Sequence, residues 1–151
     1  MIIRSVAETD IEAVVALGMR MHGESGYSFL PFDERKVRDL IRTFLDDVET
    51  RCGFVVLDRD TVVAMLGGYI ESYYFCDERF ATDIVFFVDK PYRGASIARQ
   101  LLRYFNRWAA SRGAREVALF LTSDINTERV GAFYEALGFR QAGGVYKLKL
   151  D

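Results

Sequence analysis

Hydrophobic residues follow two different periods along the chain, and each change of period marks the boundary of an expected element. Residues 1–6, "MIIRSV", are typical of a strand. Two further runs, residues 52–58 and 61–70, are rich in valine and other strand-forming side chains. Polar Arg59 and Asp60 separate these two runs. This arrangement predicts an antiparallel hairpin.

Two amphipathic helices are expected between the first strand and the hairpin. Thr9 and Glu12 have the spacing of a capping box, and apolar residues spaced three or four positions apart follow them. A loop is expected at residues 23–32, after which Asp33 is placed to cap the second helix. The apolar stripe of the second helix is Val37, Leu40, Ile41, Phe44 and Leu45.

The second half of the chain alternates strands with helices. Residues 82–89 are apolar through their middle and predict a central strand, after which the period becomes helical. Residues 116–122 predict another buried strand, and residues 128–137 a helix that Gly138 closes. The alternating residues 144–150 predict a last strand. This order of elements is typical of an α/β or α+β three-layer domain with a mixed sheet.

Length and charge narrow the class of protein. The chain has 151 residues and a net charge of −2, so we expect one domain over residues 1–151 and no field that attracts nucleic acid or anionic lipid. Its apolar runs are shorter than the roughly 20 residues that span a bilayer. The N-terminus has no signal-peptide pattern, so a cytoplasmic location is expected.

Cysteine and histidine are too few for most metal sites. Cys52 and Cys76 have no C-x-x-C spacing, and both are expected to be reduced packing residues. The single histidine, His22, excludes His-rich metal sites and is interpreted as a polar residue near the end of a helix. No bound metal is expected.

The segment "DKPYRGAS", residues 89–96, joins a buried strand directly to a helix. A helix N-terminus presents unpaired N–H groups and a partial positive charge, so it can hold phosphate. Gly94 allows close approach of a ligand, Arg93 can contact two phosphate oxygens, and Ser96 adds a hydroxyl. A plain connection with a solvated Arg93 is the alternative. The phosphate motifs G-x-x-x-x-G-K-[ST] and G-x-G-x-x-G are absent from the sequence, which argues against an NTPase, a kinase or an NAD enzyme.

Two stretches of the sequence resemble the GNAT acetyltransferase superfamily. "VDKPYRGASIARQLL" is similar to its acetyl-CoA-binding segment, Q/R-x-x-G-x-G/A, with Arg93 at the first position and Ala98 at the last. Ser96 stands where that family usually has glycine. "RVGAFYEALGFRQAG" resembles the family's late helix and turn, F/L-Y-x-x-L-G-F, without a mismatch. The order of expected elements also agrees over nearly the whole chain.

The resemblance implies a GNAT-like three-layer fold whose mixed, mostly antiparallel sheet is flanked by helices. Two central strands would separate, with the pantetheine arm of acetyl-CoA between them and its amides paired to the backbone of Phe86 and Val88. Asn126 lies near a family asparagine that contacts pantetheine, one residue further from Tyr134 than is common. The residues whose amides would hold the pyrophosphate are Arg93, Gly94, Ala95, Ser96, Ile97 and Ala98.

The reaction that the resemblance implies is attack of a neutral amine on the thioester, which needs an acid for the sulfur and a base for the amine. Tyr134 matches the family's general acid, although a tyrosine packed on a helix face is the alternative. Many members carry a glutamate nine residues before the phosphate-turn arginine, and here that position is Ile84. Neighbouring Asp83 would point to the other face unless a bulge intervenes. Glu71, on the preceding strand, could act through water.

An N-acetyltransferase of this kind would take a primary amine of a small molecule or of a protein N-terminus, and a homodimer is compatible with the sequence. The expected acceptor residues are Glu24, Glu71, Asp77 and Glu78, with Tyr27, Tyr73 and Tyr74 as an aromatic wall. The rival interpretation is a GNAT-like domain that binds acyl-CoA or a protein partner without transferring the acyl group.

Overall fold

The computed structural model describes residues 1–151, apart from the side chain of Ala95. Its strands form one five-stranded sheet in the order β1-β2-β3-β4-β5. The strands are β1 (Ile2–Ser5), β2 (Arg51–Asp58), β3 (Thr61–Ser72), β4 (Arg79–Val88) and β5 (Ala114–Ala118). Neighbours from β1 to β4 are antiparallel, whereas β4 and β5 are parallel. The expected mixed, mostly antiparallel sheet is confirmed.

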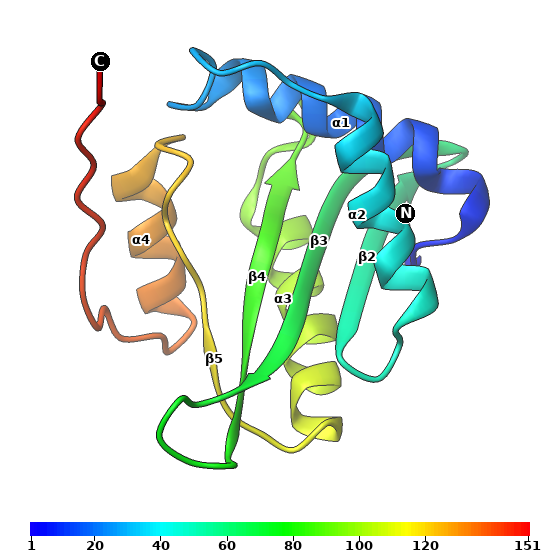
Figure 1. Ribbon diagram of the computed structural model, residues 1–151. Coiled ribbons are helices and arrows are strands. Elements are labelled where there is room, and N and C mark those ends of the chain that lie inside the picture. The colour runs from blue at the N-terminus through cyan, green and yellow to red at the C-terminus, as the bar shows by residue number, and fades with distance from the viewer.

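Helices cover both faces of this sheet (Figure 1). The helices are α1 (Ile11–Glu24), α2 (Glu34–Asp46), α3 (Ala95–Ser111) and α4 (Thr127–Ala136), with short 3-10 turns at Glu8–Asp10 and Lys90–Tyr92. One hydrophobic core lies between the sheet and α1 with α2, and a second lies between the sheet and α3 with α4. The three-layer architecture therefore agrees with the sequence. Within the described residues, no helix combines the length and the apolar character needed to cross a membrane.

Local signals in the sequence account for most element boundaries. Asp58 pairs with Thr61 across the expected two-residue turn. The Asp33 side chain caps α2 by accepting a hydrogen bond from the Lys36 amide at 3.1 Å. Gly138, which ends α4, has a φ of 94° that favours glycine. These three features confirm the interpretation of the sequence.

The start of α1 differs from the expected capping box. A 3-10 turn precedes the helix, and Asp10 accepts a hydrogen bond from the Ala7 amide at 2.7 Å. The same carboxylate forms an ion pair with Arg4 at 2.6 Å. Glu12 instead pairs with Arg38 of α2 at 2.6 Å. The expected reciprocal cap of Thr9 and Glu12 is therefore wrong. The Asp10 and Glu12 carboxylates are instead paired with the Arg4 and Arg38 guanidinium groups, and such charge-assisted hydrogen bonds are the stronger ones.

The C-terminal part of the chain holds less strand than its alternation predicted. β5 ends at Ala118, whereas the sequence predicted a strand over residues 116–122. Residues 139–151 contain no strand in the described structure, and the tail passes beside α4 rather than along the sheet (Figure 1). A strand needs a neighbour for its backbone groups, and the tail has none there. The strand expected at residues 144–150 is therefore not formed.

The two cysteines are free, as expected for reduced thiols. Cys52 is buried in the core beneath α3. Cys76, however, is exposed in the connection between β3 and β4, so the expectation that it is a packing residue is wrong. His22 lies in the last turn of α1, which confirms its expected place near a helix end.

Candidate active site

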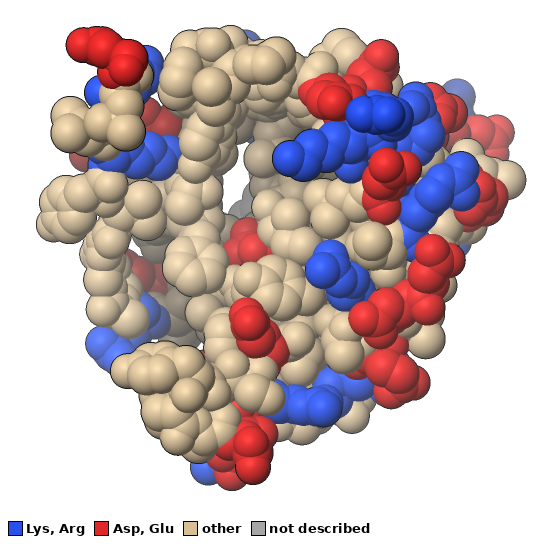
Figure 2. Space-filling view, viewed as in Figure 1, with Lys and Arg blue, Asp and Glu red and all other residues tan. Residues whose placement is uncertain are grey.

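The separation of β4 from β5 creates a cavity of about 480 Å³. Pairing between these parallel strands ends at Thr82 and Ala118. Beyond that point, residues 83–88 of β4 form one wall, and residues 120–127 form the opposite wall. Figure 2 shows the opening as a hole through the molecule below α1. The sheet therefore has the gap between two strands that the family resemblance implied, although β5 lies at the edge of the sheet and not at its centre.

Most of the expected cofactor residues line this cavity. They are Phe86, Val88, Arg93, Gly94, Ala98 and Asn126, and the candidate catalytic residues Asp83 and Tyr134 line it too. Two other expected residues do not line it: Ile97 is buried in the core, and Ser96 is exposed and accepts a hydrogen bond from Gln100 at 3.2 Å. The side chain of Ala95 lies outside the described residues.

A bulge in β4 brings Asp83 to the cavity. The register between β3 and β4 shifts so that Gly67 pairs with Val85 and Gly68 with Asp83, which leaves Ile84 between them. A Cβ on Gly68 would clash with the Thr82 carbonyl oxygen and lie 2.6 Å from the Phe105 ring, so only glycine fits opposite the bulge. Asp83 could reach the side of the sheet that faces Tyr134 only if a bulge interrupted the alternation of side chains along β4, and the structure contains this bulge.

The Asp83 carboxyl group sits in a largely desolvated position. Its Oδ1 accepts a hydrogen bond from the Phe120 amide at 3.1 Å, across the gap between the strands. Burial raises the pKa of Asp83 to about 6, and the hydrogen bonds from backbone amides only partly offset this. The group can therefore exchange a proton near neutral pH, as a general base must.

Tyr134 projects from α4 into an aromatic environment at the same cavity. Its ring stacks on Phe86 with centroids 6.3 Å apart, and it also packs against Phe133 and Phe139. Burial, and secondarily the negative charge of Asp83, raise the pKa of the Tyr134 hydroxyl above its usual value. The phenol is thus protonated at neutral pH and is a weaker acid than a solvated tyrosine.

Arg93, expected to be solvated or to contact phosphate, is paired within the protein. Its Nη2 donates to Glu24 Oε2 at 2.6 Å, and its Nε donates to the Val88 carbonyl at 3.1 Å. The guanidinium also lies 5.3 Å from the centroid of the Phe87 ring. These contacts join the end of α1 to the turn before α3. They also engage Glu24, which was expected to attract the acceptor, and the Val88 carbonyl.

Gly94 provides space rather than an unusual backbone conformation. Its φ of 172° is extended, so the turn does not require glycine. A Cβ at this position would meet nothing within 4 Å. At the other side of the cavity, Asn126 precedes α4 with a φ of 47°, a left-handed conformation that asparagine tolerates. Both residues leave backbone accessible at the cavity.

The remaining acceptor candidates lie away from the cavity. Glu71 pairs with Phe80 near the far end of β3 and does not line the cavity. The expected residues in the connection from β3 to β4 are at the end of the sheet opposite the loop between α1 and α2 (Figure 1). There the Tyr73 hydroxyl donates to Glu116 at 2.6 Å. The expected acceptor residues in this connection are Tyr73, Tyr74, Asp77 and Glu78.

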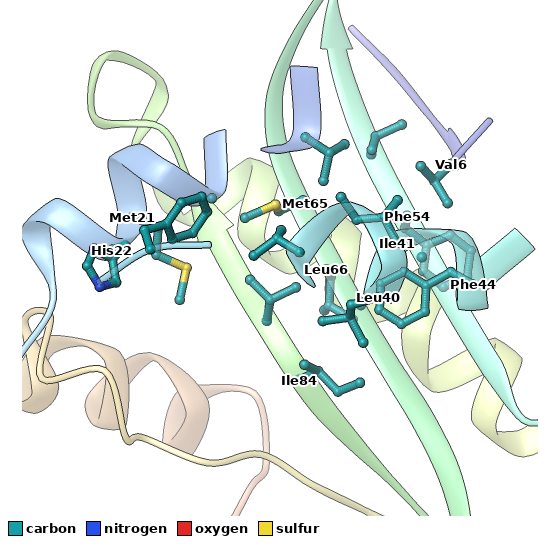
Figure 3. Close-up of a pocket in the computed structure, with 18 of the residues that line it drawn as sticks. Val6, Met21, His22, Leu40, Ile41, Phe44, Phe54, Met65, Leu66 and Ile84 are labelled. Carbon is teal, nitrogen blue, oxygen red and sulfur yellow. The ribbon is translucent and has the colours of Figure 1, made fainter. Parts of the chain in front are cut away.

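A second cavity, of about 240 Å³, was not predicted from the sequence. It lies between the sheet and α1 with α2 (Figure 3), and of the expected acceptor residues only Tyr27 lines it. The sequence signal that could have found it is Gly18, a residue without a side chain within the apolar face of α1. Met21, Ile84 and Val85 line both cavities, so the two adjoin at the bulge in β4.

Known proteins share both the sequence pattern and the fold. A model of the acetyltransferase (GNAT) family matches residues 20–139. The tetramutant of the BH1408 protein from Bacillus halodurans superposes with a TM-score of 0.81 at 20% identity, covering 99% of this chain and 100% of that one. An acetyltransferase from Trypanosoma brucei gives a TM-score of 0.74 at 19% identity, covering 99% of each chain.

A third solved structure is AAC(6')-Iy in complex with a CoA bisubstrate analogue. It superposes with a TM-score of 0.77 at 20% identity, covering 99% of this chain and 97% of that one. No curated protein sequence matches the chain. The solved structures show that the fold is shared, and the family model adds the sequence pattern.

Proposed function

The chain belongs to the acetyltransferase (GNAT) family, and from this premise we propose that it transfers the acetyl group of acetyl-CoA to a primary amine. One observation carries the proposal: a single cavity has a partly buried carboxyl group and a phenol in its wall together with the turn that precedes α3. Asp83 and Tyr134 are the two proton-transfer groups, and Arg93 belongs to the turn. A base, an acid and a phosphate-binding helix start are what acyl transfer from CoA to an amine requires.

The shape of the cavity fits the cosubstrate. Residues 84–88 of β4 have no β5 partner, so their backbone groups on that side, apart from the Val88 carbonyl that Arg93 engages, are open to the amides of a pantetheine arm. The start of α3 offers amide groups to a pyrophosphate, and the free space at Gly94 leaves room for it. Acetyl-CoA supplies an activated acyl group and a thiolate leaving group.

The residues of the chain have separate tasks in this reaction. The Asp83 carboxylate accepts a proton from the incoming ammonium, directly or through one water, and is ionised above about pH 6. The Tyr134 hydroxyl, which is protonated at neutral pH, donates a proton to the departing sulfur as negative charge develops there. Stacking on Phe86 fixes the orientation of the phenol. Base and acid are thus supplied by different layers of the fold.

The first test is binding. Calorimetry should show binding of acetyl-CoA and none of ATP or NAD, and thiol release across an amine panel should then identify acceptors. Tight binding of ATP or NAD without acetyl-CoA binding would overturn the proposal. Acetyl-CoA binding with no thiol release from any amine would favour the rival, a non-catalytic acyl-CoA-binding domain.

The second test is the Tyr134→Phe variant, which keeps the ring and its packing and removes only the hydroxyl. Turnover should fall by roughly 10²–10⁴-fold, the range for a lost general acid, while acetyl-CoA affinity changes little. Tyr104→Phe, at a half-exposed position on α3 outside the cavity, is the matched control. Unchanged turnover of Tyr134→Phe, where chemistry limits the rate, would show that the proton comes from elsewhere.

A further inference from the structure

The second cavity has an unusual chemical character for a site beside proton-transfer groups. No Asp, Glu, Lys or Arg is among the described residues that line it, and its polar members are His22, Ser25 and Tyr27, all at the α1 end. Figure 3 shows that its labelled side chains come from helices α1 and α2, from the sheet beneath them and, for Val6, from the connection after β1. The apolar members include Met21, Phe32, Leu40, Ile41, Phe44, Met65 and Ile84.

Glycines shape this cavity from two sides. A Cβ on Gly67 would lie 2.7 Å from the Phe44 ring, so the glycine lets that ring rest directly on β3. Gly18 lies across the cavity on α1, where a Cβ would meet only Phe32 at 3.6 Å and Met65 at 4.0 Å. The missing side chain at Gly18 therefore leaves part of the space open.

The bulge in β4 places the cavity next to the proposed base. Asp83 lines only the larger cavity, whereas the next two residues, Ile84 and Val85, line both. An amine held at the Asp83 carboxylate would thus have its substituent directed along Ile84 toward the second cavity. The two cavities adjoin at the point where acceptor and thioester would meet.

We propose that the second cavity binds the apolar part of the acceptor, so that the natural acceptor is a primary amine bearing an aliphatic or aromatic group. This inference rests on the proposed function. The volume of about 240 Å³ suits one side group rather than a whole ligand. A polyamine or an amino sugar would place several charged or hydroxylated groups among mostly apolar side chains, because only His22, Ser25 and Tyr27 at the α1 end could pair with them, and unpaired buried polar groups are costly.

A panel of amines tests the proposal directly. With acetyl-CoA saturating, 2-phenylethylamine and isoamylamine should give kcat/KM at least tenfold above that of ethanolamine, because each buried methylene adds to binding. Spermidine and neamine should be poorer still. The proposal is wrong if either polycation matches or exceeds 2-phenylethylamine.

Two variants of α1 localise the effect. Gly18→Leu should fill the cavity and lower kcat/KM for 2-phenylethylamine at least tenfold through KM, with little change for ethylamine or for acetyl-CoA affinity. Gly23→Leu is the matched control, because Gly23 is on the same helix, has nothing within 4 Å of a Cβ and lines neither cavity. Equal effects of both variants on 2-phenylethylamine would contradict the proposal.

If Gly18→Leu folds poorly, a variant that enlarges the second cavity instead of filling it tests the same proposal. Leu40→Ala should shift preference toward 4-phenylbutylamine over 2-phenylethylamine by several-fold. An unchanged ratio would count against the proposal.

Binding separates this inference from the proposed function. With CoA present, 2-phenylethylamine should raise the melting temperature of the wild type and not of Gly18→Leu. If acetyl-CoA itself does not bind, the proposed function fails. If acetyl-CoA binds and only the polycations bind or react, the apolar acceptor alone is refuted.

Discussion

At the scale of single residues, Asp83 couples stability to activity through its buried carboxyl group. Its folded-state pKa of about 6 lies above the usual value, so the folded protein holds this proton more tightly than the unfolded chain does. The contribution to stability is therefore present below about pH 4 and is lost as the pH rises through 6. Catalysis needs the opposite ionisation state, since a base must be deprotonated.

Replacement of Asp83 by asparagine should separate these two effects. At pH 7.5, Asp83→Asn should lower turnover by about 10²–10³-fold and raise the free energy of unfolding by about 1–3 kcal/mol. At pH 4 the stability gain should disappear. Thermal unfolding at both pH values checks this, and wild-type kcat/KM should rise with pH to a plateau above about 6. A flat profile between pH 5 and 7.5 would contradict the assignment of Asp83 as the base.

The ion pair between Arg93 and Glu24 makes a prediction about cosubstrate affinity. A pyrophosphate at the start of α3 would compete with Glu24 for the Arg93 guanidinium, because the two groups are 2.6 Å apart here. Glu24→Gln should therefore tighten acetyl-CoA binding about two- to tenfold, measured by calorimetry. Glu12→Gln is the control, since Glu12 also lies on α1 and pairs with an arginine, Arg38, at the same distance. Weaker binding by Glu24→Gln would show instead that Glu24 positions Arg93 for the ligand.

At the scale of elements, the bulge in β4 depends on its neighbour in β3. Gly68 faces the Thr82 carbonyl and the Phe105 ring, and any side chain there would push β3 away from both. Gly68→Ala should lower the free energy of unfolding by about 2–4 kcal/mol, measured by denaturant titration. Gly143→Ala, where a Cβ meets nothing within 4 Å, should change it by less than about 0.5 kcal/mol. Similar stabilities for the two variants would contradict this account.

The parts of the site that could be predicted from sequence are those that consecutive residues encode. The turn before α3 and the helix that carries Tyr134 are each encoded by consecutive residues, and both line the larger cavity. The sequence does not decide whether β4 has a bulge at Ile84, because the bulge depends on packing between Gly68 and Phe105, which are far apart in the chain. The smaller cavity was missed for the same reason, since α1, α2 and the sheet all contribute to it.

Alternation alone misled the interpretation at the C-terminus. Residues 144–150 have the period of a strand, but period states only which side chains would share a face and supplies no partner for the backbone. In the structure Val145, Tyr146, Leu148 and Leu150 are exposed. Asp77 and Glu78 were assigned to the acceptor site because they lie in a connection between two strands. The path of such a connection varies and is not encoded by its own residues, so its distance from the cavity could not be predicted.

At the scale of the whole molecule, three segments far apart in sequence meet beside the two cavities. The Gly26 amide, in the loop between α1 and α2, donates to the Ser123 carbonyl at 2.8 Å. The C-terminal tail joins them, because Lys147 donates to the Thr122 carbonyl and lies 4.2 Å from the centroid of the Tyr27 ring. Tyr27 lines the second cavity, so the tail supports one wall of that cavity.

This support should appear in acceptor kinetics and not in cosubstrate binding. Lys147→Ala removes the cation from the Tyr27 ring and should raise KM for the acceptor about two- to fivefold, the size expected for an exposed cation–π contact. Acetyl-CoA affinity should stay within about twofold. Lys149→Ala is the matched control, because Lys149 lies 4.1 Å from the centroid of the Phe29 ring, which lines neither cavity. Steady-state kinetics of both variants against one acceptor would decide, and equal KM values for both would remove the tail from the acceptor site.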